Sequence, residues 1–165
     1  MLNKLNKTLV SDLMQADYLT LSPDMSLSQA LKLLCESGAS HGMVKDQSRL
    51  IGVLSHQEIL RGLWSAEFDS SNQACVRDLM QTQLTTVSCC QPLAQLLETW
   101  VVDRQKLFPV NDMASLICSG YQSYEERLRL AGSELPELLP VVEEDKLLGV
   151  LTRQQLGSWV ATQMS

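Results

Sequence analysis

The sequence LIGVLS at residues 50–55 returns as LLGVLT at residues 147–152. Each is a short aliphatic run that ends in a hydroxyl residue and precedes a polar segment with a helical pattern. This arrangement is typical of a buried strand followed by a helix. The glycine inside each run removes a side chain, so another backbone or a ligand can approach closely. The hydroxyl stands where the strand meets the helix, and there it can cap the helix or help to hold an anion.

A second pair of matching segments shows that the chain contains a duplicated unit. VSDLMQ at residues 10–15 corresponds to VRDLMQ at residues 76–81, and TLS at residues 20–22 matches TVS at residues 86–88 at the same spacing. Matches that persist at one spacing mark a repeated unit whose single copy is too small to close its own core. We therefore predict two domains and a polar linker, at residues 10–64, 76–160 and 65–75 respectively.

The first copy shows the element order strand, helix, strand, strand, helix. Ser26 has the position of a helix N-cap, and Gly38 has the position of a C-terminal stop. The duplication then predicts an α/β fold of two tandem β-α-β-β-α units related by a pseudo-twofold axis. In the first copy we expect strands at residues 18–21, 42–45 and 50–54 and helices at residues 27–36 and 56–64.

The second copy carries an insertion at about residues 107–137. FPV at residues 108–110 is similar to LPV at residues 139–141, so the insertion could be a degenerate strand-strand-helix unit with extended segments at 108–112 and 116–119. The alternative is a surface excursion whose similarity arises by chance. Ser123 and Glu126 form a capping-box signature for a helix near residues 123–131, ended by Gly132.

Composition argues against several functional classes. The 13 Lys and Arg residues stand against 19 Asp and Glu, a formal charge of −6, so neither nucleic acid nor a membrane is expected as a partner. No apolar run approaches the roughly 18 residues of a membrane span, and residues 1–10 lack a signal-peptide core, which predicts a cytoplasmic protein. No nucleophile-base motif or Gly-rich phosphate loop appears, so we expect no enzyme and no catalytic residues.

Five cysteines show neither an even count nor a Cys-x-x-Cys spacing. Neither a disulfide framework nor a zinc site is therefore predicted, and most of the cysteines are expected to be reduced and buried. Cys89 and Cys90 stand side by side in an expected turn, where the pair could be oxidised.

The duplicated pattern resembles a known family. Asp-Leu-Met, then Thr-x-x-Pro-Asp, an aliphatic helix and Gly-hydrophobic-hydrophobic-Ser/Thr-x-x-acid are similar to the cystathionine-β-synthase (CBS) domain. Two copies in tandem resemble the pair called a Bateman module, and the resemblance covers about residues 10–160. It implies a regulatory module that holds AMP, ADP, ATP or S-adenosylmethionine in clefts between the two domains, with no other cofactor.

The resemblance also implies which residues face the ligand. Copy one, with Thr20, Ser55 and Glu58, is the stronger predicted cleft because copy two has uncharged Gln155 where the acid belongs, and charged acceptors form stronger hydrogen bonds. Arg153 is the expected phosphate partner. The hydroxyls and the acid could instead serve only to cap helices. The predicted ligand-binding residues are Thr20, His41, Ser55, His56, Glu58, Thr86, Thr152, Arg153 and Gln155; none is assigned to a metal.

Two functions of different classes remain open at this point. The leading prediction is a stand-alone regulatory module that senses an adenosine-containing ligand and passes its state to a partner protein, which the sequence does not identify. The alternative is a ligand-free protein-interaction or dimerisation module whose clefts are filled by side chains. The apolar helix face of Leu60, Leu63 and Trp64 is consistent with a homodimer, as in similar CBS pairs.

Overall fold

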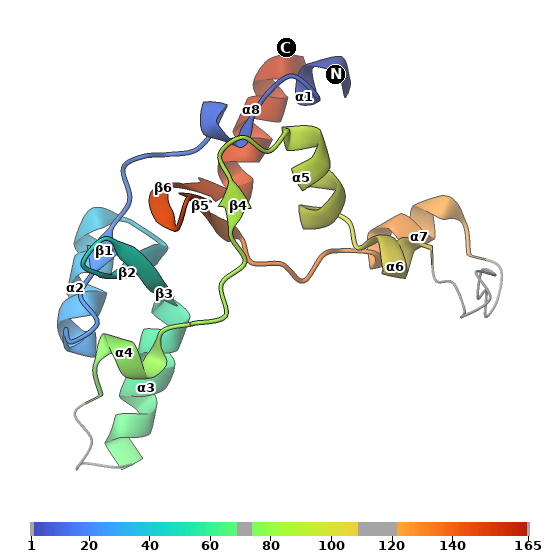
Figure 1. Ribbon diagram of the computed structural model, residues 1–165. Helices are drawn as coiled ribbons and strands as arrows, with labels where there is room; N and C mark the ends of the chain where they lie inside the picture. The colour runs from blue at the N-terminus through green and yellow to red at the C-terminus, as the bar shows by residue number, and fades with distance from the viewer. Residues whose placement is uncertain (1, 69–73, 109–121, 165) are drawn as a thin grey trace.

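One six-stranded sheet runs through the protein, and each half of the sheet repeats the other (Figure 1). The computed structural model describes residues 2–68, 74–108 and 122–164. In each half a short strand pairs in parallel with the first arm of an antiparallel hairpin, and the two hairpins meet at the pair Arg49 and Lys146. The strand order is β1-β2-β3-β6-β5-β4. The strands are β1 (Thr20–Leu21), β2 (His41–Asp46), β3 (Arg49–Ser55), β4 (Val87–Ser88), β5 (Leu138–Glu143) and β6 (Lys146–Thr152).

The helices complete two β-α-β-β-α units, as the duplication predicts. Ser26 caps α2 by accepting a hydrogen bond from the backbone N–H of Gln29, and Gly38 ends this helix with a φ of 68° in the left-handed region. The α/β fold is confirmed, and the repeated strand order supports the pseudo-twofold relation. The helices are α1 (Leu2–Leu5), α2 (Leu27–Ser37), α3 (His56–Phe68), α4 (Val76–Leu79), α5 (Leu93–Trp100), α6 (Arg104–Leu107), α7 (Tyr124–Leu130) and α8 (Arg153–Met164), with a 3-10 turn at Val10–Asp12.

Several boundaries differ from the sequence prediction. The first strand is confined to Thr20–Leu21, and α3 continues one turn beyond the predicted end, to Phe68. Residues 65–75 were predicted as a linker because they lack periodicity, but the helical backbone continues to Phe68. The short helices α1, α4 and α6 were not predicted, since four-residue helices give too little periodicity to recognise.

The segment that precedes each copy packs against the other copy. Val10 is buried in the second copy's core beside Val87, Leu93 and Trp100. Val76 occupies the equivalent place in the first copy's core. The two halves are thus interlocked by reciprocal segments, and a third buried cluster lies between them: Met43, Val53, Leu138, Leu147 and Val150.

The glycines of the repeated motif lie where these crossing segments pass. A Cβ at Gly149 would stand 2.6 Å from the backbone oxygen of Gln15, and one at Gly52 would stand 2.5 Å from Sδ of Met80. The expected close approach at both glycines is therefore confirmed, and the approaching group comes from the opposite copy. Glycine is required at 149 because a backbone carbonyl held in a pairing cannot move aside.

Helix α6, just before the insertion, and α7 within it extend away from the two halves as an arm (Figure 1). The predicted capping box is present: Ser123 accepts from Glu126 N–H, and the Glu126 carboxylate accepts from Ser123 N–H. The helix ends at Leu130, with Ala131 at its C-cap and Gly132 next, so the predicted end near Ala131 is confirmed to within one residue. The segments predicted to be extended, 108–112 and 116–119, lie almost entirely outside the described residues.

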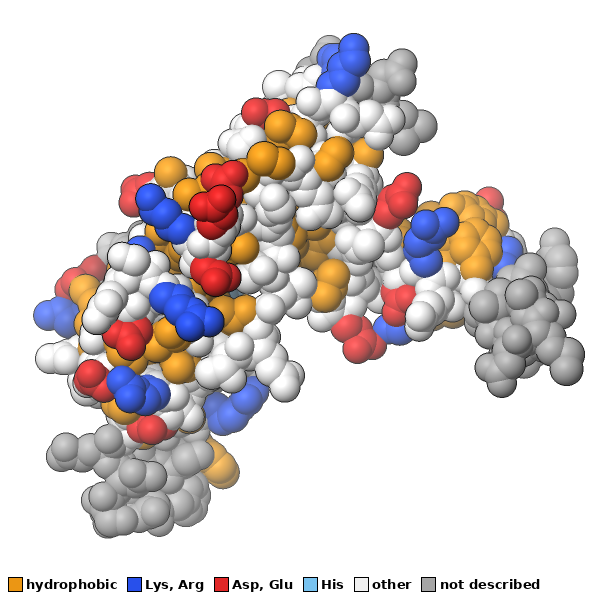
Figure 2. All heavy atoms as spheres, in the orientation of Figure 1, with side chains coloured by type: hydrophobic (Ala, Val, Ile, Leu, Met, Phe, Trp, Pro, Cys, Tyr) orange, Lys and Arg blue, Asp and Glu red, His pale blue; other side chains and the backbone are white. Residues whose placement is uncertain are grey.

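Apolar side chains are exposed on this arm, and Figure 2 shows them gathered over α6 and α7. They are Phe108, Tyr124, Leu128 and Leu130. The two ends of the arm are joined at its base by Asp103 N–H, which donates to the Ala131 oxygen at 2.7 Å. Among the described residues, none of the helices combines the length and the hydrophobicity needed to cross a membrane.

Candidate functional site

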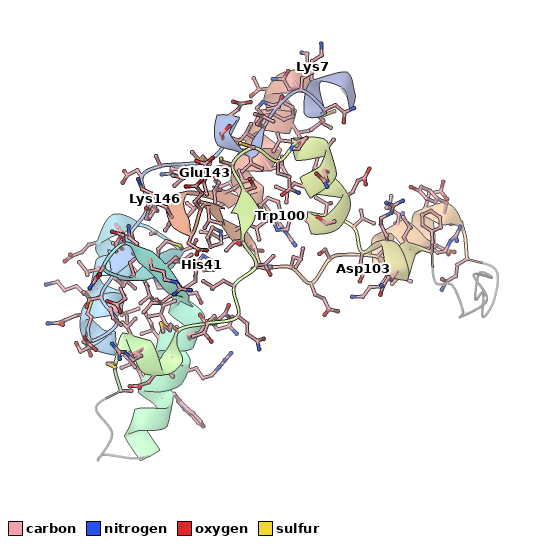
Figure 3. The ribbon with its side chains drawn as sticks, viewed as in Figure 1. Lys7, His41, Trp100, Asp103, Glu143 and Lys146 are labelled. Atoms are coloured by element: carbon pink, nitrogen blue, oxygen red, sulfur yellow. The ribbon has the colours of Figure 1, made fainter. Side chains whose placement is uncertain are left out.

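A cavity of about 740 Å³ lies between the two copies and is the larger of two cavities that contain predicted site residues. The first copy contributes Thr20 of β1 and His41 of β2, and the second contributes Thr152 at the end of β6 and Gln155 in the first turn of α8. Figure 3 shows His41 near the junction of the two halves. This larger cavity therefore combines the first strand of one copy with the helix start of the other.

The smaller cavity, of about 530 Å³, contains the Ser-x-x-acid motif of the first copy. Ser55, His56 and Glu58 line it from the start of α3, and Glu137 lines it from the second copy. His41 lines both cavities. Thr86 is exposed and lines neither of these two cavities.

The grouping expected from the sequence is corrected by this arrangement. Thr20 was expected beside Ser55 and Glu58, but it faces Thr152 and Gln155 instead. The physical reason is that each cavity lies between the copies, so residues of one repeat are divided between the two cavities. The expected grouping of Thr20 with Ser55 and Glu58 in one cleft is therefore wrong, while the relative strength of the two clefts stays a prediction.

Glu58 belongs to a helix cap at the start of α3. Its carboxylate accepts hydrogen bonds from Ser55 N–H at 2.9 Å, from the Ser55 hydroxyl, and from Gln81 Nε2 at 3.1 Å. Partial burial acts to raise the pKa of Glu58, but these hydrogen bonds to the charged form outweigh it and leave the pKa below its ordinary value. The carboxylate that was predicted to face the ligand is therefore already engaged by the protein.

Gln155 makes the corresponding cap in the second copy. Its side-chain oxygen accepts from Thr152 N–H at 2.7 Å, and its backbone N–H donates to Thr152 Oγ1 at 3.2 Å. Its Nε2 donates to Oε1 of Gln15 at 3.0 Å. Gln15 and Gln81 are equivalent residues of the repeat, so in both copies the cap is bonded to the crossing segment from the other copy.

His41 is partly buried and lies where it lines both cavities. Burial lowers the pKa of His41, while the charges of Glu58 and Glu137 partly oppose this and His56 adds to it. The lowered pKa of His41 favours its neutral form, and its Nδ1 lies 2.9 Å from the Ser40 hydroxyl. A neutral imidazole offers one donor and one acceptor to a ligand in either cavity.

Arg153 has a different role from the predicted phosphate contact. Its guanidinium donates to the backbone oxygens of Trp100, Ser133 and Leu135, with the Leu135 bond at 2.8 Å. Its charge also lies over the Trp100 ring, 5.9 Å from the centroid. Arg153 therefore fastens the end of the insertion to α5, and it lines neither of the two cavities.

Sequence reasoning missed Asp17, which lines the larger cavity. Within the described part of the chain, its carboxylate has no hydrogen-bond or ion-pair partner. Ser40 and Tyr18 also line this cavity, and Tyr18 is held by Lys45, whose Nζ lies 3.3 Å from its hydroxyl. No motif marked Asp17, because it lies before β1 in a segment without periodicity.

Comparison with known proteins identifies the fold. Residues 10–65 match the family model of the CBS domain. The first copy is therefore a CBS domain, and the chain as a whole has the fold of a CBS-domain pair. No curated protein matches the chain.

Three solved structures illustrate this fold. A CBS domain-containing protein of unknown function from Bacillus anthracis has 20% identity and a TM-score of 0.66, with 98% of each chain covered. CBSX2 in complex with AMP has 22% identity and a TM-score of 0.63, covering 95% of this chain and 98% of its own. The CBS domain pair of MJ0100, in complex with 5′-methylthioadenosine and S-adenosyl-L-methionine, has 16% identity and a TM-score of 0.61, covering 94% and 98%.

Proposed function

We propose that this protein is a regulatory module that binds an adenosine-containing ligand in the larger cavity, between Thr20 and Thr152. The observation that carries this proposal is the open volume of about 740 Å³ at the junction of the two copies. Ligand pockets for small molecules commonly enclose about 300–1,000 Å³. Side chains leave this cavity open, which favours a ligand over the alternative of a ligand-free module.

The lining offers the groups that a nucleoside needs. Apolar side chains, Leu138, Val150 and Met43, provide a surface for the base. The hydroxyls of Thr20 and Thr152 can donate or accept hydrogen bonds, and the carboxylate of Asp17 can accept from both ribose hydroxyls. Asp17 thereby takes the role that the sequence assigned to Glu58.

The charge of the lining favours some adenosine ligands over others. No Lys or Arg occurs among the described residues that line the larger cavity, and Asp17 is acidic. A polyphosphate would therefore enter without a cationic partner and beside a negative charge, which costs free energy. We infer that uncharged or cationic adenosyl compounds, 5′-methylthioadenosine and S-adenosylmethionine, bind better than ATP. The MJ0100 pair, which has the same fold, is in complex with both of these compounds.

The smaller cavity is a weaker candidate for the same ligand. Glu58 is held in the helix cap and Glu137 adds a second acid, so the lining is more negative and offers fewer unengaged groups.

Acidic and basic side chains are interspersed on the face of the molecule shown in Figure 2. The site chemistry thus favours a small ligand over a large anionic partner.

A ligand in the larger cavity would contact both halves of the protein, and this suggests how binding could produce a signal. A ligand in the larger cavity contacts β1 of one copy and the start of α8 of the other, whereas the sheet joins the halves at Arg49 and Lys146. A bound ligand would therefore fix the position of one half against the other, and a partner protein would sense that change. We propose a binding role rather than a catalytic one; a cytoplasmic location stays a prediction.

Thermal-shift measurements with 5′-methylthioadenosine, S-adenosylmethionine, AMP and ATP test the proposal. A ligand at 100 times its dissociation constant adds about 2.7 kcal/mol to the stability of the native state. We expect the two adenosyl compounds to raise the melting temperature more than ATP does. Thr152→Val should reduce the shift, while Ser55→Ala, which removes the equivalent hydroxyl in the smaller cavity, should leave it unchanged. No shift with any of the four compounds would favour the ligand-free interaction module.

A further inference from the structure

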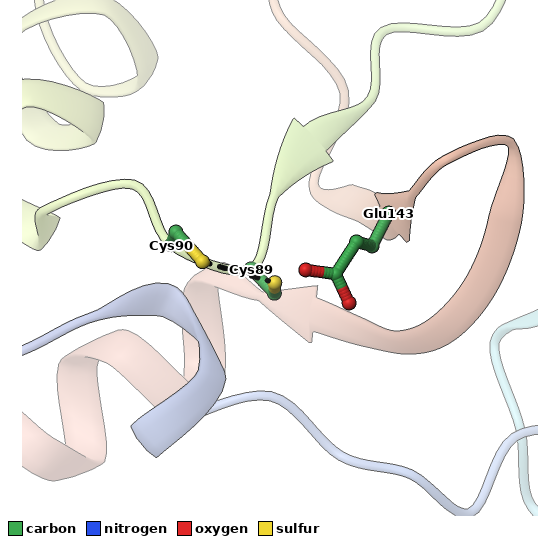
Figure 4. A group of neighbouring side chains, drawn as sticks. All are labelled: Cys89, Cys90 and Glu143. Carbon is green, nitrogen blue, oxygen red and sulfur yellow. Dashed lines mark hydrogen bonds between the residues drawn. The ribbon is translucent and has the colours of Figure 1, made fainter.

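A group of metal-ligating side chains lies away from both cavities, at the end of β4 (Figure 4). Cys89 and Cys90 follow β4 in a turn, with their sulfur atoms 3.5 Å apart. Glu143 ends β5, and the parallel pairing of Ser88 with Val142 brings it beside the two thiols. The two sulfurs and a carboxylate oxygen of Glu143 all lie within 4.8 Å of one another.

The distances fit one ion held by all three groups. Zinc binds thiolate sulfur at about 2.3 Å, so two sulfurs on a tetrahedral zinc are separated by roughly 3.8 Å. The observed 3.5 Å between the sulfurs of Cys89 and Cys90 requires little adjustment. Two soft sulfur ligands and one carboxylate suit a thiophilic cation and leave a fourth position for water.

We propose that Cys89, Cys90 and Glu143 form a binding site for a thiophilic divalent cation of the zinc type. No sequence motif indicates this site, because adjacent cysteines lack the usual Cys-x-x-Cys spacing and the carboxylate comes from a strand far along the chain. Pairing of β4 with β5 assembles the three ligands.

Backbone hydrogen bonds hold the turn that carries the two thiols. Ser11 N–H donates to the Cys89 oxygen at 3.0 Å, and Val10 N–H donates to the Gln91 oxygen at 3.0 Å. The turn is thus held between β4 and the crossing segment from the N-terminus. A preorganised pair loses less conformational entropy on binding than two mobile side chains would.

Burial and access are both suitable for a cation. Cys89 is 6% exposed, whereas Cys90 and Glu143 are exposed, so an ion can enter from solvent and be shielded on one side. A cation would relieve the mutual repulsion that the three groups would have as anions.

The other described cysteines lack this arrangement and provide controls. Cys35 lies 4.0 Å from His56 Nε2, and Cys75 contacts the Asp78 carboxylate that caps α4. Neither has a second thiol beside it among the described residues. Cys35 is exposed, so Cys35→Ser removes one thiol without disturbing the core.

Titration of the reduced, metal-free protein with Cd²⁺, followed by the ultraviolet absorption of the sulfur-to-cadmium charge transfer, tests the proposal. A second titration with Zn²⁺ in competition with a chromogenic chelator measures affinity. We expect one ion per chain, a loss of at least half of the cadmium signal in Cys90→Ser, and affinity about tenfold weaker in Glu143→Gln. Both of these substitutions are at exposed positions, so circular dichroism should show unchanged folding. Cys35→Ser should bind as the wild type does.

Two results would overturn the proposal. The first is a wild-type protein, with its thiols reduced, that binds no cadmium at tenfold excess. The second is an equal cadmium signal in Cys90→Ser and Cys35→Ser, which would show that any exposed thiol accounts for it.

Discussion

Gln15 of the first copy pairs through its backbone with Val150 of the second: Gln15 N–H donates to the Val150 oxygen at 2.8 Å, and Val150 N–H donates to the Gln15 oxygen at 2.9 Å. Gln81 and Val53 make the reciprocal pair, at 2.8 and 3.0 Å. Each half of the protein therefore contains a segment from the other half. We expect the two copies to unfold in one cooperative transition rather than independently.

Gly149→Ala should be strongly destabilising. The new Cβ would lie 2.6 Å from the backbone oxygen of Gln15, and the pairing with Val150 leaves that oxygen no room to retreat. We expect a loss of about 1–3 kcal/mol in the free energy of unfolding, measured by urea denaturation. Gly52→Ala should cost less, because its new Cβ meets the flexible side chain of Met80.

Gly157→Ala is the matched control. Gly157 lies within α8, and a Cβ there meets nothing within 4 Å, so the same change should raise stability by about 0.4–1 kcal/mol. If Gly149→Ala were as stable as the wild type, the close approach of Gln15 would be contradicted.

Glu58 should contribute stability that depends on pH. Its pKa is lowered in the folded protein, so its contribution is fully present above the ordinary value of 4.5 and is lost as the pH falls through the lower, folded value. Glu58→Gln should therefore reduce the loss of stability below about pH 4.5, as measured by urea midpoints across this range. Glu36→Gln, which removes an exposed acid of α2, is the control. Equal acid sensitivity in Glu58→Gln and the wild type would disprove the capping role.

Arg153→Ala should destabilise the protein without weakening adenosyl binding. The substitution leaves the oxygens of Trp100, Ser133 and Leu135 without their charged donor, at a cost of about 1–3 kcal/mol. Denaturation midpoints and calorimetric titration measure the two effects separately. A loss of ligand affinity with unchanged stability would restore the phosphate-partner prediction.

Homodimer formation through helices of both copies stays a prediction, and a surface substitution on α3 can test it. Leu60 is 56% exposed and Trp64 is 65% exposed on this helix. Leu60→Asp should convert a dimer to a monomer, because a charge at an apolar contact is costly to bury. Light scattering measures the mass, and Leu128→Asp on the α7 arm is the control. A wild type that is monomeric at high micromolar concentration would exclude the dimer.

Local patterns were sufficient to predict most elements of the fold. The repeated LIGVLS and LLGVLT runs are β3 and β6, and the polar segments after them begin α3 and α8. The caps at Ser26 and Ser123 were predictable because capping depends on residues only three apart.

The site was less predictable because it depends on how the copies meet. Thr20 and Thr152 belong to different repeats and share a cavity only through the packing of one half on the other. Asp17 carries no motif, and Arg153 contacts an insertion that has no counterpart in the first copy. Motifs along the sequence do not show these contacts between distant residues.

Calorimetric titration with S-adenosylmethionine, comparing Asp17→Asn with Glu137→Gln, tests the central claim most directly. Both substitutions turn a cavity-lining acid into its amide, one in the larger cavity and one in the smaller. We predict one ligand per chain in the wild type, affinity about tenfold or more weaker in Asp17→Asn, and unchanged affinity in Glu137→Gln. Unchanged binding in Asp17→Asn, or a loss confined to Glu137→Gln, would contradict the assignment of the ligand to the cavity between Thr20 and Thr152.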